Sequence, residues 1–234
     1  TPIGLGLVHN FALEHSREGR YWDCWDILTQ SFVSAALEEL IPIADRRGDT
    51  ARARKWRERY ATLQGAIRQY LMREVDGKQV YMEMRLPDSG AGVPFEGLGW
   101  LNFGAVAAQW KGLDAEVTRN TVAALSQRAL RDWQGHIWLA DDWWPDGSVA
   151  PQVIGKGVGW EIDWCLREGE WERIEQWMDF LTVVHPEGSL YMEAANLFPD
   201  DTWHLQDSGN GEQCSWWCWG MARLRKELGL PAAP

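Results

Sequence analysis

Glu212 is the first candidate for chemistry in this sequence. It follows the Gly-Asn-Gly turn at 209–211 and opens an apolar, tryptophan-rich segment, 211–228, that has helical periodicity. An acid at a helix N-terminus can simply stabilise the helix dipole. Tryptophan faces also stack on sugar rings, and a fixed carboxylate can activate water against a glycosidic bond. We therefore expect Glu212 to be a general base, with Gln213 and Trp216 as substrate contacts.

Two aspartates, Asp23 and Asp26, lie three residues apart in the segment YWDCWD at 21–26, where we expect a buried helix to begin. On a helix this spacing places both carboxylates on one face. A pocket lined by tryptophan raises the pKa of a carboxyl group and keeps it protonated, as a general acid requires. N-capping is the structural alternative. We expect Asp26 or Asp23 to donate the proton, and substrate contacts from Tyr21, Trp22 and Trp25.

Further acids lie at the starts of buried helices, inside them or in loops. Glu161 and Asp163 are two apart within one predicted helix, so they cannot face the same way. An acid inside a buried helix is costly unless it lines a cavity. For the loop acids, turn chemistry is the alternative. The further residues from which we expect substrate contacts are Glu96, Trp100, Asp142, Trp143, Trp144, Glu161 and Glu193.

The composition limits the classes of function that this protein can have. The 234 residues, of which 45% are hydrophobic and 24% charged, suit one globular domain spanning 1–234. A net charge of −11 lacks the basic footprint of a nucleic-acid binder. Seventeen tryptophans are more than a core of this size requires. Tryptophan is large and its indole N–H needs a partner, so cores usually contain Leu or Ile instead. The excess suggests a ligand surface, with an oligosaccharide or glycoside as the leading ligand.

We expect no metal or organic cofactor. The four Cys and five His lack the spacings of zinc sites, and no Gly-x-Gly-x-x-Gly or P-loop pattern occurs. Reduced, buried thiols would fit a cytoplasmic protein. No apolar run reaches the ~18–20 residues of a membrane span, so no membrane partner is expected. The chain begins at Thr1 without a Met, and we expect an N-terminal part to lie outside this sequence.

Helical periodicity runs along the whole chain. Segments that are apolar on most sides alternate with amphipathic ones, which predicts pairs of an inner and an outer helix. The inner helices are expected at 21–44, 95–110, 152–167 and 211–228, and the outer helices at 50–72, 114–131 and 170–184.

The connectors between these pairs also repeat. Each runs through a Gly, an aromatic residue and an acid, and the aromatic residues Tyr81, Trp138 and Tyr191 are 57 and 53 residues apart. Repeating pairs with a repeating connector predict an all-α fold, an α/α toroid whose long connectors build a site at one end. Six pairs would need roughly 340 residues, and about three and a half are present. We expect an incomplete toroid, or a partner segment or N-terminal domain that completes it.

Three short segments carry a resemblance to a known group of enzymes. They are YWDCWDILTQ at 21–30, LYME at 190–193 and GNGEQ at 209–213. Together they resemble the C-terminal part of six-hairpin glycoside hydrolases, the group of glucoamylases, trehalase-like and mannosylglycerate-hydrolase-like enzymes and bacterial glycogen-debranching relatives. The resemblance implies hydrolysis of an α-linked glucosyl or related sugar with inversion. Glu212 matches the base of that group, and the acid is Asp26 or a residue before Thr1.

Two other functions stay open at this point. One is a polysaccharide lyase on the same toroid, in which Tyr21 or a histidine would abstract a proton beside a uronate. A lyase needs cations to neutralise that carboxylate, whereas the expected rim is acidic. The other is a helical-repeat domain that binds carbohydrate or protein without catalysis. It predicts a smooth concave surface without convergent carboxylates.

Overall fold

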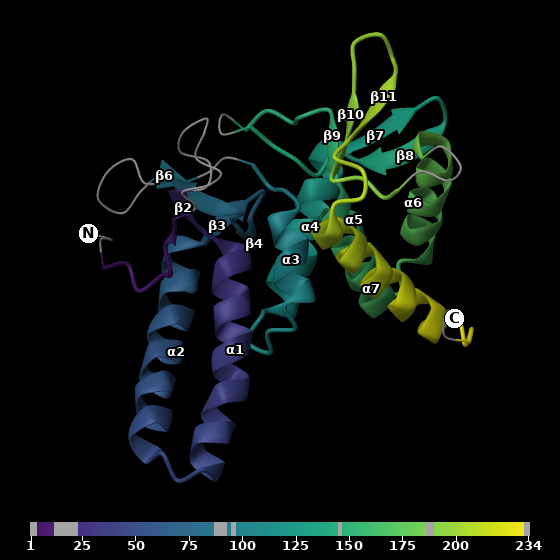
Figure 1. Cartoon of the computed structure of the whole chain (residues 1–234). Coiled ribbons are helices and arrows are strands. Elements are labelled where there is room, and N and C mark those ends of the chain that lie inside the picture. Colours follow the sequence, from purple (N-terminus) through teal and green to yellow (C-terminus); the bar gives the residue numbers. More distant parts are fainter. Residues whose placement is uncertain are drawn as a thin grey trace. The chain divides into compact units, whose positions relative to one another are not determined.

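The computed structural model describes residues 4–11, 23–86, 93–94, 97–144, 147–185 and 190–231. Within these ranges there are seven helices: α1 (Ile27–Arg46), α2 (Thr50–Tyr70), α3 (Leu101–Ala107), α4 (Ala115–Ala129), α5 (Gly155–Glu168), α6 (Trp171–Val184) and α7 (Gly211–Glu227). Each helix overlaps, over most of its length, a segment whose periodicity predicts one, and α1 and α5 end one or two residues later than expected. The predicted helices are confirmed, with the first and third beginning later than expected (Figure 1).

The expected all-α fold, an α/α toroid, is wrong. The described residues are 54% helical and 18% strand, and their strands form four small antiparallel sheets. The strands of the described residues are β1 (Asn10–Phe11), β2 (Asp23–Asp26), β3 (Met72–Val75), β4 (Lys78–Tyr81), β5 (Met84–Leu86), β6 (Val93–Pro94), β7 (Leu130–Trp133), β8 (His136–Leu139), β9 (Gln152–Ile154), β10 (Ala194–Leu197) and β11 (Trp203–Gln206). The protein therefore has a mixed α and β composition.

Tight turns explain why the connectors form strands. Asp76 and Gly77 both have positive φ, 51° and 76°, and they join the paired strands β3 and β4. Gln134 and Gly135, with φ of 53° and 89°, join β7 and β8 in the same way. Two successive residues with positive φ form the turn that matches the twist of a two-residue hairpin. The segments after α2 and α4 therefore fold back as β-hairpins.

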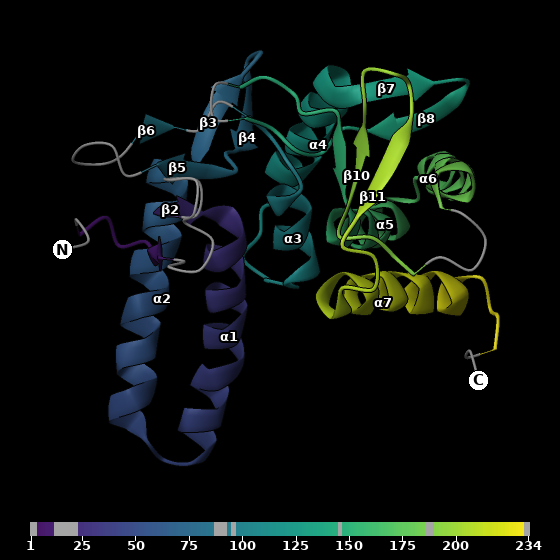
Figure 2. The same cartoon turned by 45° about the horizontal axis from the view of Figure 1, so that its top comes forward.

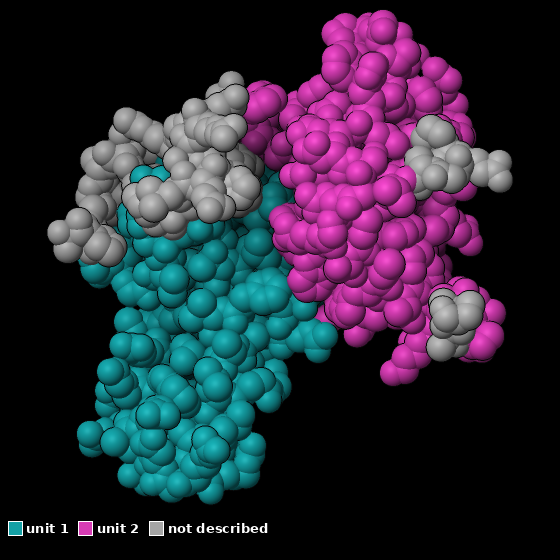
Figure 3. Space-filling model, in the orientation of Figure 1, with its two compact units in different colours: residues 1–124, 145–147 teal, residues 125–144, 148–234 magenta. Residues whose placement is uncertain are grey.

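The described chain divides into two compact units (Figure 3). Unit 1 comprises residues 1–124 and 145–147, and unit 2 comprises residues 125–144 and 148–234, so the boundary falls within α4. In unit 1, α1 packs along α2 and contacts α3, and a sheet in the order β1-β2-β5-β6 lies at the start of α1 (Figure 1). The core of this unit includes Cys24, Ile67, Met84 and Phe103.

Helix α1 is less buried than its apolar sequence predicts. Leu40 and Ile43 are 40% and 41% exposed. By length and composition, α1 is also the one helix of the described residues that could cross a membrane, although a third of its most apolar window is buried in the protein. The core helix of a folded domain and a signal sequence share this length and composition, so the property alone does not assign α1 to a membrane.

In unit 2, α5 packs closely along α7, and both views show the two helices side by side (Figures 1 and 2). A Cβ added to Gly159 would lie 2.6 Å from the carbonyl oxygen of Trp216, and one added to Gly220 would lie 2.9 Å from the carbonyl oxygen of Gly159. Helices α5 and α7 therefore approach closely at these two glycines. Strands β9, β10 and β11 form a sheet in the order β11-β10-β9.

Many of the tryptophans belong to the core. Trp138, Trp160 and Trp177 are almost fully buried in unit 2. Trp138 stacks on Phe180 with ring centroids 5.8 Å apart, and Trp203 meets both rings edge-on. Edge-to-face packing of this kind stabilises aromatic clusters beyond the area that they bury. The high tryptophan content therefore serves packing as well as any ligand surface.

Candidate functional site

The start of α5 is capped by side chains and backbone from three separate segments. The backbone N–H groups of residues 154–156 donate, in chain order, to Asp141 Oδ1 at 2.9 Å, to the carbonyl oxygen of Glu193 at 2.7 Å and to Gln213 Oε1 at 2.6 Å. The first N–H groups of a helix have no partner within the helix and need such acceptors. The loop after β8, the start of β10 and the first turn of α7 therefore meet at the start of α5.

Helix α7 begins at the same place. Its N-cap, Asn210, accepts the backbone N–H groups of Glu212 and Gln213 on Oδ1, at 3.0 and 3.4 Å. The amide nitrogen of Asn210 donates to Glu193 Oε2 at 3.1 Å. Asn210 thus connects the cap of α7 to a second carboxylate. We call the region formed by Asp141, residues 154–156, Glu193 and residues 210–213 the α5–α7 junction.

Glu212 projects from the junction and is paired with a lysine. Its side chain is 57% exposed, in the first turn of α7 as the sequence predicts. Lys156 Nζ donates to Glu212 Oε1 at 2.9 Å, and the lysine side chain is only 15% exposed. The ammonium group also lies 6.0 Å from the centroid of the Trp160 ring. The arrangement offers a fixed carboxylate to a solvent-borne ligand.

Aromatic rings surround the junction. Tyr191 stacks on Trp217 with centroids 4.8 Å apart, and its hydroxyl donates to the carbonyl oxygen of Gly155 at 2.8 Å. Trp216, which was expected to contact the substrate, is partly exposed and meets Trp160 edge-on at 5.2 Å. Burial raises the pKa of Tyr191 well above its ordinary value, and the neighbouring Asp141 adds to the effect. Tyr191 is therefore a neutral hydrogen-bond donor that holds the start of α5.

Asp141 is the fully buried acid of the junction. Its pKa is raised well above the ordinary value, first by burial and then by the nearby carboxylates of Asp142 and Glu161. The hydrogen bond from Ile154 N opposes this shift. Because the carboxyl group has no exposed surface, we assign it a capping role for α5 and no direct contact with a ligand.

The two acids inside α5 are held by arginines. Glu161 Oε1 accepts from Arg173 Nε of α6 at 2.8 Å. Asp163 is bracketed by Arg167 at 2.6 Å and by Arg223 of α7. As predicted, the two carboxylates point to different neighbours. Both are buried within unit 2, where they join α5 to the helices on either side.

The two aspartates at 23 and 26 lie on strand β2, not on a helix. Asp26 is the N-cap of α1: Thr29 N and Oγ1 donate to its two oxygens at 2.6 and 2.8 Å, and Asn10 Nδ2 donates at 3.1 Å. It is buried, and burial raises its pKa. Because the segment is extended, the argument that helix spacing places both acids on one face does not apply. Asp26 therefore has the N-capping role that was the structural alternative to catalysis.

Asp23 has a different environment. Its carboxylate pairs with His9 Nε2 at 2.8 Å and keeps 37% of its side-chain surface exposed. Trp25 lies beside this pair, with its ring centroid 4.9 Å from that of His9. Of the two candidate acids, Asp23 is therefore the one that a ligand could reach in unit 1.

The remaining predicted contacts divide by burial. Trp25, Trp100 and Trp143 are buried, and Trp144 is 53% exposed. Asp142 Oδ1 accepts the N–H of the next residue at 3.1 Å, which is turn chemistry. Glu193 and Gln213 belong to the junction with Glu212. Tyr21, Trp22 and Glu96 lie outside the described residues.

Sequence reasoning missed Lys156, Asn210 and His9 as partners of the predicted acids. Asn210 was visible as part of the Gly-Asn-Gly turn, because asparagine is a preferred N-cap. A lysine in an apolar helix was a second signal, since a buried ammonium group needs an anion. The pairing of Lys156 with Glu212, across 56 residues, required the tertiary structure.

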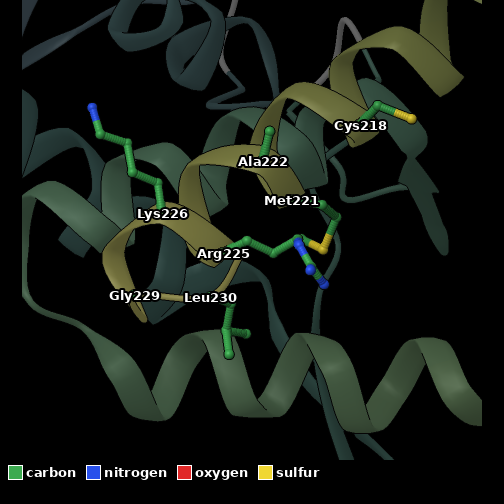
Figure 4. Close-up of a pocket in the computed structure, with 7 residues that line it drawn as sticks. All are labelled: Cys218, Met221, Ala222, Arg225, Lys226, Gly229 and Leu230. Carbon is green, nitrogen blue, oxygen red and sulfur yellow. The ribbon is translucent and has the colours of Figure 1, made fainter. Parts of the chain in front are cut away.

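A separate hollow of about 730 Å³ lies at the other end of α7 (Figure 4). Its lining comes from the C-terminal half of the helix and the residues after it: Cys218, Met221, Ala222, Arg225, Lys226, Gly229 and Leu230. At 1.5 Å per residue, Arg225 is about 20 Å along α7 from Glu212. The hollow is therefore not part of the junction.

No known protein family matches this chain, and no curated protein is significantly similar to it. Among the residues that the structure describes, no group of three or more His, Cys, Asp or Glu side chains is placed to hold a metal ion. The four cysteines are all free thiols, of which Cys24 and Cys165 are buried and Cys218 is exposed. A functional proposal therefore depends on two groups of residues, the α5–α7 junction of unit 2 and the Asp23–His9 pair of unit 1.

Proposed function

We propose that this protein is an inverting glycoside hydrolase in which Glu212 activates water. The observation that carries the proposal is the exposed carboxylate of Glu212 at the meeting point of two helix N-termini, fixed by Lys156 at 2.9 Å and by the Asn210 cap behind it. A general base must be held in place and open to water at once. Among the carboxylates of the α5–α7 junction, Glu212 has the greatest exposure, since Asp141 is buried and Glu193 is partly covered.

The proposed reaction is a single displacement. The carboxylate of Glu212 accepts a proton from water as the water oxygen bonds to the anomeric carbon. The bond from that carbon to the leaving oxygen breaks, and a protonated carboxyl group donates its proton to that oxygen. Atoms and charge balance, and the anomeric configuration inverts. No metal or organic cofactor enters this step.

For the proton donor, exposure favours Asp23 over Asp26. A donor must exchange its proton with the substrate, and the oxygens of Asp26 are occupied by Thr29 and Asn10 within a buried cap. Asp23 keeps an exposed edge beside His9.

The substrate that we propose is an α-linked glucosyl or related sugar, and the support for it is the resemblance of the motifs at 21–30, 190–193 and 209–213. The rings of Trp216 and Trp217, together with Trp144, are partly exposed and supply faces that could stack on a sugar.

The test is hydrolysis of a panel of aryl α- and β-glycosides and α-disaccharides by the wild type and by Glu212→Gln. Removal of the base should lower kcat by about 10²- to 10⁴-fold, the range of general base catalysis. Glu227→Gln is the matched control, because it makes the same change at the exposed far end of α7. Retained circular dichroism would exclude unfolding. The anomer of the first product, read by NMR, tests inversion.

A binding domain without catalysis is the second candidate, and one observation favours it. Asp26, which is one of the two positions that the resemblance allows for the acid, serves as a buried helix cap. This candidate predicts quenching or a shift of tryptophan fluorescence on addition of oligosaccharides, with no product. Hydrolysis that disappears in Glu212→Gln would exclude it, and binding without any turnover would exclude the hydrolase.

A further inference from the structure

The ion pair between Lys156 and Glu212 differs from the surface pairs of this protein. Lys111 and Glu39 also pair, at 2.7 Å, but both side chains are more than 70% exposed. Lys156 is 15% exposed, whereas its partner is 57% exposed. Withdrawing an ammonium group from water is costly unless an anion compensates. The ammonium group of Lys156 therefore lies mostly within the protein, whereas the carboxylate of Glu212 is largely exposed to solvent.

The backbones that carry the pair are locked together. Gln213 Oε1 accepts the backbone N–H of Lys156 at 2.6 Å, one residue along α7 from Glu212. Three residues after Lys156, Gly159 lies so close to Trp216 that an added Cβ would come within 2.6 Å of the carbonyl oxygen of Trp216. Helices α5 and α7 cannot slide past one another without breaking these contacts. The backbone positions of Lys156 and Glu212 are therefore fixed relative to each other.

The pair distinguishes the two oxygens of Glu212. Oε1 accepts from Lys156 Nζ, and Oε2 accepts no hydrogen bond from any residue that the structure describes. Anchoring one oxygen fixes the side-chain torsions of an otherwise exposed glutamate. The position of Oε2 is then fixed as well. A base that acts on a single water molecule needs a fixed oxygen position, because a misplacement of about 1 Å can cost 10²-fold in rate.

We propose that Lys156 is a positioning residue, which holds Glu212 by Oε1 and leaves Oε2 as the oxygen that takes the proton from water. The inference rests on the proposed function of Glu212. It adds a residue whose contact is with the base and not with the sugar. Loss of Lys156 should therefore affect kcat and leave KM little changed.

Two readouts test the inference, and one of them is independent of activity. A water-soluble carbodiimide joins a carboxylate and an amine only when they are in contact, and mass spectrometry of the digested protein identifies the joined peptides. We expect the peptide of Lys156 joined to that of Glu212 in the wild type, and no such product in Glu212→Gln. Absence of the joined peptides in the wild type would overturn the inference.

The kinetic readout compares Lys156→Met and Lys156→Arg with the wild type. Methionine keeps the apolar stem beside Trp160 and removes the charge, and arginine keeps a donor. We expect Lys156→Met to lower kcat about ten- to hundredfold, with KM within about twofold and partial recovery in Lys156→Arg. Lys111→Met, which removes an ion pair of similar length from unit 1, should leave kcat unchanged. If Lys156→Met fails to fold, Lys156→Arg and Lys156→Gln give the same comparison.

The outcomes separate this inference from the proposed function. Loss of activity in Glu212→Gln together with wild-type kcat in every Lys156 variant would overturn the positioning role and leave the hydrolase standing. A wild type that is inactive on all glycosides would overturn both, even if the peptides are joined, because the pair would then be structural. A lower kcat together with a clearly raised KM in Lys156→Met, which indicates weaker sugar binding, would also contradict a residue that acts only through Glu212.

Discussion

The side-chain oxygen of Gln213 accepts the backbone N–H of Lys156 at 2.6 Å, although the two residues are 57 apart in sequence. Gln213 is buried at the first turn of α7, and Lys156 lies in the first turn of α5. One helix thus caps the other. This bond, together with the Asn210 cap, places the candidate base at the surface of unit 2.

Gln213→Ala should therefore destabilise the protein. It leaves the N–H of Lys156 without its acceptor in a mostly buried place, which costs about 1–3 kcal/mol of unfolding free energy. Urea denaturation followed by circular dichroism measures the change. Gln206→Ala, at an exposed position of β11, is the control and should change the free energy of unfolding by no more than about 0.5 kcal/mol. Equal effects in both variants would argue against the inter-helix cap.

Two glycines in helices should respond oppositely to alanine. Gly159→Ala places a Cβ 2.6 Å from the carbonyl oxygen of Trp216, so α5 and α7 must separate, and we expect a loss of about 1–3 kcal/mol. Gly65 lies within α2 with nothing within 4 Å of an added Cβ. Gly65→Ala should stabilise by about 0.5–1 kcal/mol, because alanine is the better helix former. Thermal unfolding of both variants measures the sign, and a stabilising Gly159→Ala would refute the close packing.

The buried Asp141 predicts a pH dependence of stability. Its folded-state pKa is raised, so its contribution is complete below the unfolded pKa of about 3.9 and is lost as the pH rises through the folded value. Asp141→Asn keeps the acceptor for Ile154 and removes the titration. The free energy of unfolding of the wild type, minus that of the variant, should therefore fall as the pH rises above about 4.

The exposed Asp200 is the control for this experiment, because its pKa is shifted in the opposite direction. The hydroxyl and N–H of Thr202 lower the pKa of Asp200, so its contribution is present above the unfolded pKa and lost as the pH falls. The wild-type stability relative to Asp200→Asn should therefore rise with pH through the acid range. Urea titrations at several pH values give both slopes. A flat difference for Asp141→Asn would contradict the raised pKa of this buried carboxyl group.

Asp163 connects α5 to α7 through its two arginines. Asp163→Asn leaves Arg167 and Arg223 beside a neutral amide, and removing one partner of a buried ion pair costs about 3–5 kcal/mol. Because both arginines are more than a third exposed, we expect the lower end of that range. Asp45→Asn, which breaks an exposed pair with Arg57, should cost at most about 1 kcal/mol. Chemical denaturation distinguishes the two.

The proton donor can be identified by the leaving group. If Asp23 is the acid, Asp23→Asn should be strongly impaired on alkyl glycosides and much less on dinitrophenyl glycosides, whose leaving oxygen needs no proton. Asp26→Asn keeps a good N-cap for α1 and should be active on both. Rates on the two substrate classes give the comparison. The reverse pattern would assign the acid to Asp26.

The sequence predicts the seven helices because their apolar residues repeat over many turns, as in α5 and α7. It misses the strands because these are two to four residues long and lie between helices whose periodicity dominates. The Asp-Gly pair at 76–77 is a local hairpin signal, but it lies in a segment that the repeat pattern assigns to a connector. The place of Glu212 follows from its local turn. Its lysine partner does not, because contacts between distant segments leave no local pattern.

The three acceptors at the start of α5 come from both sides of that helix in the sequence. Local folding of α5 alone cannot complete its first turn, since Asp141, Glu193 and Gln213 arrive only when the β-hairpins and α7 are in place. The amide hydrogens of residues 154–156 should therefore exchange with solvent only when unit 2 opens as a whole. Helix N-termini normally fray and exchange quickly. Here the end of a helix becomes one of the slowest reporters of cooperative unfolding.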